Sequence, residues 1–123
     1  MTLASGNDAD DLARKGVTNP EEFLQVVVVD NGAGPEIHLR GELDMATASL
    51  LRDELVRLTP DGPRQVTVDL AQLAFIDSTG LSVLITGLKR IRQQGGDMTL
   101  RSPNPGTRKV LEITGLTEVF SIS

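Results

Sequence analysis

Segments with the two-residue period of a β-strand alternate along this chain with segments of helical spacing. Strand character belongs to four short runs, which are residues 26–29, 37–39, 66–70 and 98–100. Helical spacing belongs to three segments, which are residues 47–58, 81–91 and 107–113. Strand–helix–strand units of this length favour parallel strands joined by right-handed crossovers, so the alternation predicts an α/β fold.

The two ends of the pattern add a hairpin and a last apolar segment. Turn-forming residues 30–35 separate the first two strands closely enough to predict an antiparallel hairpin. Ile37 and Leu39 share one face of the second strand, so His38 is predicted to point the other way, toward solvent. Residues 60–63 are rich in proline and end the first helix, and residues 116–122 offer a last strand. We expect one α/β domain with a mixed sheet of four or five strands and three or four helices packed on it.

Length and composition narrow the classes of function. A chain of 123 residues can bury one core, and we expect a domain over residues 23–123 after a flexible extension over residues 1–22. The absence of cysteine and the single histidine argue against disulfides and against thiolate or histidine-rich metal sites. A net charge of −5 with no Trp or Tyr argues against a nucleic-acid partner. No run approaches the roughly 20 apolar residues of a membrane span and no secretory signal is evident, so we expect a cytoplasmic protein without a membrane partner.

The sequence FIDSTGL at residues 75–81 places a carboxylate, two hydroxyls and a glycine between a strand and a helix. The first turn of a helix has unpaired backbone N–H groups and a partial positive charge, so a phosphate on a hydroxyl there finds donors nearby. The same chemistry makes Ser78 a candidate for a plain helix cap. Because α/β sheets usually carry their function at the carboxyl ends of strands, this turn is the leading candidate site.

Catalytic roles for this turn find little support in the sequence. Asp77 and Ser78 are adjacent, so they do not by themselves make a nucleophile and base, and there is no G-x-S-x-G elbow. Gly32-Ala33-Gly34 lacks the spacing of a dinucleotide fingerprint, and no glycine is followed by Lys-Ser or Lys-Thr. We therefore expect no enzymatic activity and no cofactor. Two roles stay open for Ser78, as a plain helix cap and as a phosphoacceptor.

Three segments together resemble a known family. GELD at residues 41–44, VTVDL at residues 66–70 and FIDSTGL at residues 75–81 are similar to the STAS domain of bacterial anti-sigma factor antagonists. The resemblance extends from about residue 23 to the C-terminus. It implies that the unmodified protein binds an anti-sigma factor that is also a serine kinase, and so releases a sigma factor. It further implies that the kinase phosphorylates Ser78, that a metal-dependent serine phosphatase reverses this, and that ATP and Mg²⁺ belong to the kinase.

The resemblance also assigns residues to a partner-binding surface around the phosphoacceptor. The residues concerned are Glu42, Asp44, Asp77, Ser78, Thr79, Gly80 and Ser82. Glu42 and Asp44 have a structural alternative, as an exposed loop acid and a helix cap. Thr79 is a second hydroxyl in the same turn and an alternative acceptor. Ser82 departs from some relatives that have glycine there, which changes the crowding at the helix start.

Two other functions stay open at the level of sequence. One is a STAS subunit of another signalling or transporter assembly, in which Ser78 is a cap or a switch of a different kind. The other is a small nucleotide-binding or hydrolytic protein. Binding or turnover of ATP or GTP by the isolated chain would favour the second of these.

Overall fold

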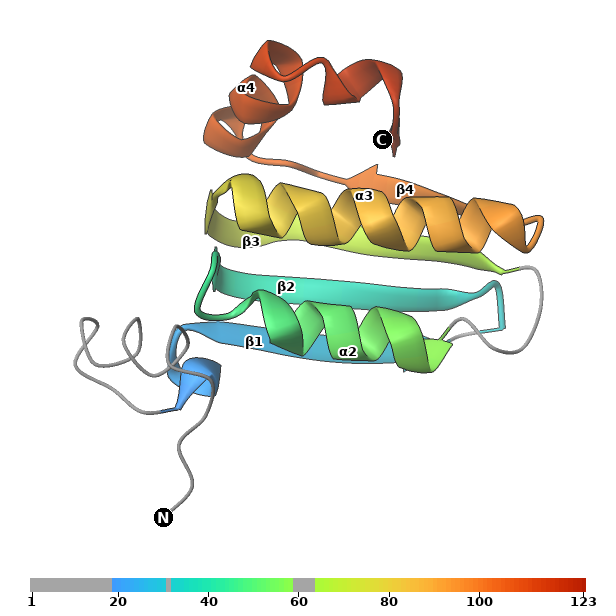
Figure 1. Ribbon diagram of the computed structural model, residues 1–123, viewed down its shortest axis with the longest axis horizontal. Coiled ribbons are helices and arrows are strands. Elements are labelled where there is room, and N and C mark those ends of the chain that lie inside the picture. The colour runs from blue at the N-terminus through green and yellow to red at the C-terminus, as the bar shows by residue number, and fades with distance from the viewer. Residues whose placement is uncertain (1–18, 31, 59–63) are drawn as a thin grey trace.

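The computed structural model describes residues 19–30, 32–58 and 64–123, which form a five-stranded mixed sheet with helices packed on it (Figure 1). The strands follow one another across the sheet and are β1 (Leu24–Asp30), β2 (Pro35–Leu43), β3 (Gln65–Ile76), β4 (Asp97–Arg101) and β5 (Ser121–Ile122). The helices are α2 (Ala48–Leu58), α3 (Ser78–Gln93) and α4 (Pro105–Ile113), with short 3₁₀ turns at Pro20–Glu22 and Leu116–Glu118. Among the described strands only β1 and β2 pair antiparallel, which confirms the predicted α/β class and the N-terminal hairpin.

Two predictions fall at least partly on residues outside those described. They are the flexible extension, of which residues 1–18 are not described, and the proline-rich end of the first helix at residues 60–63. Asn19 is described, and its side-chain Oδ1 accepts a hydrogen bond from Glu21 N at 3.0 Å, which caps the first 3₁₀ turn.

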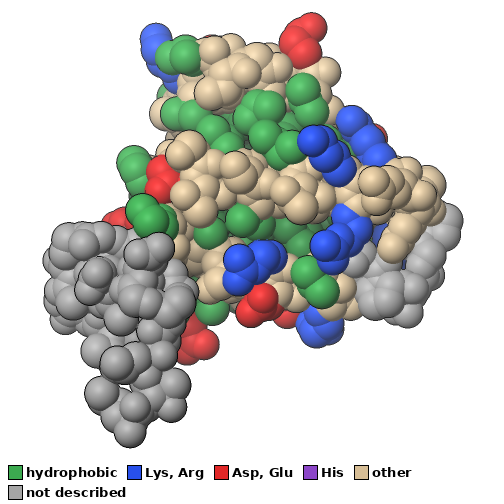
Figure 2. Space-filling model, viewed as in Figure 1, with side chains coloured by type: hydrophobic (Ala, Val, Ile, Leu, Met, Phe, Trp, Pro, Cys, Tyr) green, Lys and Arg blue, Asp and Glu red, His purple; other side chains and the backbone are tan. Residues whose placement is uncertain are grey.

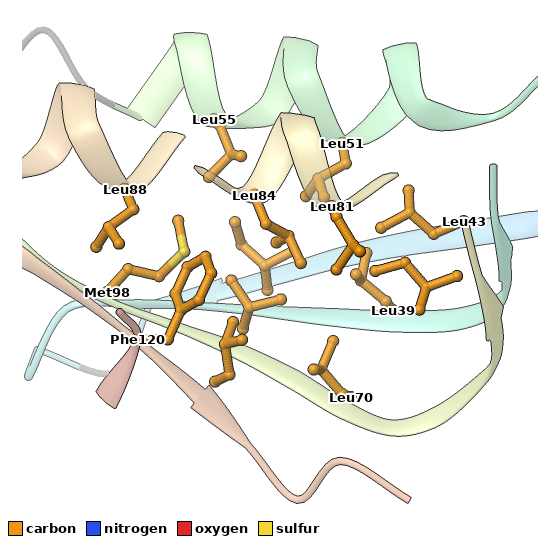
Figure 3. Packing of buried hydrophobic residues seen from close by; sticks show 14 of the residues in the cluster. Leu39, Leu43, Leu51, Leu55, Leu70, Leu81, Leu84, Leu88, Met98 and Phe120 are labelled. Carbon is orange, nitrogen blue, oxygen red and sulfur yellow. The ribbon is translucent and has the colours of Figure 1, made fainter. Parts of the chain in front are cut away.

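α2 and α3 cover one face of the sheet, and the core lies between these two helices and the sheet (Figures 1 and 3). Leu51 and Leu55 of α2 and Leu84 and Leu88 of α3 point toward the sheet and are almost fully buried. In the first halves of β2 and β3 every second residue is buried, because successive side chains of a strand point to opposite faces. In the second half of β3 the buried residues are Leu73 and Ile76, three positions apart, and the pairing with β2 shifts its register there. The apolar stripes seen in the sequence are thus the contact between helices and sheet.

The opposite face of the sheet carries a charged cluster on its middle strands. Arg101 of β4 lies 3.0 Å from Glu36 of β2 and 2.9 Å from Asp69 of β3. His38 is on this face too, as predicted, with its Nε2 3.2 Å from Glu36 Oε1 and 42% of its side chain exposed. The Arg101 hydrogen bond, and then that of His38, hold the pKa of Glu36 below its ordinary value. Burial acts to raise the pKa of Asp69, but hydrogen bonds from the Ala71 N–H and Arg101 outweigh it and lower that pKa.

Within the described part of the chain, no strand pairs with the second half of β3 on its β4 side. β4 pairs with β3 only from Gln65 to Asp69, and beyond that point α4 packs against β3. Asn104 joins the two, because its Nδ2 donates to the Leu73 carbonyl while its Oδ1 accepts from Thr107 N at 2.9 Å as the cap of α4. Because β2 and β3 are parallel, their carboxyl ends lie at the same end of the sheet, where the predicted site lies.

Candidate functional site

The site lies where β2 and β3 end side by side. The two strands are parallel, and their last residues pair as Glu42 with Phe75 and Leu43 with Ile76. The backbone N–H of Asp77 continues this contact by donating to the Leu43 carbonyl at 3.1 Å. Parallel pairing thus brings residues 42–44 beside residues 77–80, although about 35 positions separate them in the chain.

Asp77 caps α3 and also ties the helix to the turn after β2. Its backbone is extended, its Oδ1 accepts from Gly80 N at 2.9 Å, and its Oδ2 accepts from Met45 N at 3.1 Å. Ser78 is the first residue of the helix, so the prediction that Ser78 itself is the cap is wrong. The reason is that the chain is still extended at Asp77, which places the aspartate side chain, rather than the serine, over the first N–H groups.

Ser78 is exposed in the first turn of a firmly held helix. Its hydroxyl makes no hydrogen bond to another residue that the structure describes, whereas Gly80, two residues later, is buried. A Cβ on Gly80 would lie 2.8 Å from Leu43 Cγ, 2.9 Å from the Leu43 carbonyl oxygen and 3.0 Å from Ile76 Cγ1. Since only glycine permits this approach, α3 starts directly against β2 and β3, and Ser78 stands at a fixed position. Thr79 is half-buried, and Ser82 is exposed one turn further along α3.

Asp44 stabilises the turn that leads into α2. It is 9% exposed, its Oδ1 accepts from Ala46 N at 3.0 Å, and its carbonyl accepts from Ala48 N at 2.8 Å. Thr47 adds to this turn, because its hydroxyl donates to the Glu42 carbonyl at 2.7 Å and accepts from Asp44 N at 3.0 Å. These hydrogen bonds hold Asp44 within the turn that precedes α2. Glu42 is half-buried within β2, not in an exposed loop as one of its alternatives held.

Two exposed apolar side chains beside the turn were not predicted as site residues. Phe75 is 51% exposed and lies opposite Glu42, and Met45 is 51% exposed and bonded through its backbone to Asp77. Phe75 is visible in the sequence, because a strand that buries Ile76 turns Phe75 to the other face. The position of Met45 cannot be predicted from the local sequence, because it depends on the hydrogen bond from Met45 N to Asp77.

A groove of about 200 Å³ lies between α2 and α3, next to the turn that holds Ser78. Thr79 and Ser82 line it together with Arg52, Val56 and Arg90. Among the residues that the structure describes, no cluster of three or more His, Asp or Glu is suited to a metal ion. Within the same residues, no helix combines the length and apolar character that crossing a membrane requires.

This chain belongs to the STAS domain family. The family model described as "Mlab, STAS domain" matches residues 26–121, and the resemblance seen in the sequence is thereby confirmed. A relative from Bacillus subtilis (strain 168), the anti-sigma-B factor antagonist, is 31% identical over 100 residues, which cover 81% of this chain and 91% of that protein.

Solved structures show the same architecture. An anti-sigma factor antagonist from Mycobacterium paratuberculosis has a TM-score of 0.74 at 25% identity and covers 86% of this chain and 89% of its own. SpoIIAA in its unphosphorylated form has a TM-score of 0.70 at 22% identity, with 80% of this chain and 88% of its own covered. The likeness to SpoIIAA shows the shared fold.

Proposed function

We propose that this protein is an anti-sigma factor antagonist that is switched by phosphorylation of Ser78. In the proposal, the unphosphorylated form binds an anti-sigma factor that is also a serine kinase, and the bound anti-sigma factor releases its sigma factor. The observation that carries the proposal is the exposed Ser78 hydroxyl at the first position of a helix held in place by Asp77 and Gly80. The name of the Bacillus subtilis relative, an anti-sigma-B factor antagonist, supports it.

The exposed residues around Ser78 suit a docking surface. Met45 and Phe75 each leave about half of their side chain in solvent, at the same edge of the sheet as Ser78. A partner that covers both side chains gains a binding free energy of about 25 cal/mol for each Å² of apolar surface that it buries. It also surrounds the Ser78 hydroxyl, so the group that is modified lies inside the interface. We assign Glu42, Asp77, Thr79, Gly80 and Ser82 to this surface or to its support.

Phosphorylation changes the charge of this surface without removing its fold. The γ-phosphoryl group of ATP is transferred to Ser78 Oγ, which gives ADP and releases the hydroxyl proton; the ATP and Mg²⁺ belong to the kinase. The phosphate adds about −1.5 to −2 charges beside the Asp77 carboxylate. The start of α3 tolerates an anion because of its N–H groups and helix dipole. A docked partner does not, because the phosphate adds bulk, repulsion and a desolvation cost to the interface.

The proposed role is regulatory and not catalytic. Both Asp77 oxygens accept backbone N–H groups, one as the cap of α3 and the other from the turn after β2. No side chain that the structure describes is hydrogen-bonded to the Ser78 hydroxyl as a base. A metal-dependent serine phosphatase restores the active form by hydrolysis of the phosphoserine to serine and inorganic phosphate. We place the cycle in the cytoplasm, because the kinase requires ATP.

The test compares Ser78→Ala and Ser78→Asp with wild type. The partner is the anti-sigma kinase of the source organism, recovered on immobilised Ser78→Ala protein and then expressed and purified. We expect Ser78→Ala to bind as wild type does and to resist inactivation by ATP, whereas Ser78→Asp binds at least about tenfold more weakly, or about 1.4 kcal/mol. Ser123→Asp, an exposed serine beside β5, is the matched charge control. Equal affinity of wild type and Ser78→Asp would refute the switch.

Mass spectrometry after kinase treatment decides between the two hydroxyls. We expect phosphate on Ser78, because Ser78 is exposed while Thr79 is half-buried and lines the groove. Phosphate on Thr79 alone would move the site by one residue and leave the switch in place.

A further inference from the structure

The groove between α2 and α3 continues the surface around Ser78. Its α3 wall includes Ser82, Thr86 and Arg90, which are spaced four residues apart. Residues four apart lie on the same side of a helix, and Ser78 is one such step before Ser82. The proposed phosphoacceptor and the groove therefore lie along one line on α3.

The groove combines an apolar lining with a basic rim. Val56 is 46% exposed and supplies apolar surface together with Leu55 and Val83. Among the residues that the structure describes, no Asp or Glu lines the groove. Two arginines, Arg52 and Arg90, stand at its sides, and Figure 2 shows Lys and Arg side chains over the face formed by α2 and α3. This basic rim is distinctive in a chain with a net charge of −5.

Neither arginine is used in a strong ion pair within the described residues. The carboxylate nearest to Arg52 is Asp53 at 3.8 Å, and both side chains are largely exposed, at 61% and 77%. An exposed pair of this kind contributes little to stability. Arg90 is exposed and forms no ion pair with a residue that the structure describes. Both cations are therefore available to a partner.

We propose that this groove docks an acidic amphipathic segment of the anti-sigma partner. This inference rests on the proposed function and adds the chemistry of the partner that the groove recognises. Apolar side chains of the segment contact Val56 and Val83, while its carboxylates pair with Arg52 and Arg90. A volume of about 200 Å³ is below the roughly 300–1,000 Å³ of small-molecule pockets, which favours a peptide segment that lies across the groove.

The position of the groove gives the switch a second route of action. An acidic segment in the groove ends near Ser82, one helical turn from Ser78. A phosphate on Ser78 then repels the carboxylates of that segment as well as adding bulk at the turn. Complementary charge also speeds association, so part of the effect of the phosphate is a slower on-rate.

Charge reversal tests the basic rim. The double variant Arg52→Glu/Arg90→Glu changes two exposed side chains, so circular dichroism and the melting temperature should stay as in wild type. We expect its affinity for the purified anti-sigma kinase to fall about tenfold, mainly through slower association, with a weaker dependence on salt. The control Lys89→Glu/Arg108→Glu makes the same charge change at two exposed side chains outside the groove lining, and should weaken binding less than threefold. Equal losses in the two variants would overturn the inference.

A cross-link identifies the occupant directly. The chain has no cysteine, so Thr86→Cys carries a single photo-crosslinker in the groove, and Val27→Cys, 54% exposed on the opposite face of the sheet, carries the same group as a control. We expect Thr86→Cys to capture a partner peptide that contains Asp or Glu beside apolar residues, and Val27→Cys to capture none. Capture of a basic peptide, or of no peptide, by Thr86→Cys would overturn the inference.

These experiments separate the inference from the function on which it rests. If wild type and Ser78→Asp bind the kinase equally, the proposed function fails. If Ser78→Asp loses binding while the groove variants bind as wild type does, the function stands and the groove inference alone fails.

Discussion

Replacing Asp77 by alanine should loosen the start of α3 and the turn after β2 together. The carboxylate caps the helix through Gly80 N at 2.9 Å and binds Met45 N at 3.1 Å. Loss of a helix cap costs about 1 kcal/mol, and loss of a charge-assisted hydrogen bond costs about 1–2 kcal/mol more. We therefore expect Asp77→Ala to lower the free energy of unfolding by about 2–3 kcal/mol.

Urea denaturation followed by circular dichroism measures this loss. For a domain of this size a loss of 1 kcal/mol lowers the melting temperature by about 3–5 °C, so a drop of about 6–15 °C is expected as well. Asp77→Asn keeps one carbonyl oxygen, so its free energy of unfolding should fall by about half as much as that of Asp77→Ala. Asp53→Ala, which removes a side chain that is 77% exposed, is the control and should change stability by less than about 0.5 kcal/mol. A loss below 0.5 kcal/mol in Asp77→Ala would refute the role assigned to this carboxylate.

Two further predictions follow from contacts near the site and on the opposite face of the sheet. Gly80→Ala places a Cβ within 3.0 Å of Leu43 and Ile76, and should lower the free energy of unfolding in urea by about 1–3 kcal/mol; unchanged stability would mean that α3 moves away freely. Arg101 lowers the pKa values of Glu36 and Asp69 in the folded state. The folded state is therefore stabilised by these ion pairs above the unfolded pKa values, which are near 4, and this stabilisation is lost as the pH falls through the lowered folded-state values. Unfolding of Arg101→Ala should therefore depend less on pH below about 5 than unfolding of wild type, and identical profiles would contradict this.

Local patterns in the sequence predict most of the fold. The burial of Leu51, Leu55, Leu84 and Leu88 follows from their spacing along helices, and the alternation in the first half of β3 follows from the period of a strand. Parallel pairing then accounts for the approach of residues 42–44 to residues 77–80, because both segments follow strands at one edge of the sheet.

Features that depend on distant contacts escape prediction from local patterns. Asp77 and Ser78 are both good capping residues, and the choice between them is set by where the extended chain ends, at the hydrogen bond from Asp77 to the Leu43 carbonyl. The partners of His38 are another case, because Glu36 is held in place by Arg101, which is 65 positions away. The groove arises only when α2 packs on α3, so neither helix shows it alone.

The central claim is that a phosphate on Ser78 decides whether the protein binds its anti-sigma partner. The most direct measurement is calorimetric titration of the purified anti-sigma kinase with two preparations of the wild-type chain, one unmodified and one carrying a single phosphate on Ser78 as verified by mass spectrometry. We expect the unmodified protein to bind and the phosphorylated protein to bind at least tenfold more weakly, a difference of about 1.4 kcal/mol, with the same melting temperature within about 3 °C. Equal affinities of the two preparations would contradict the account.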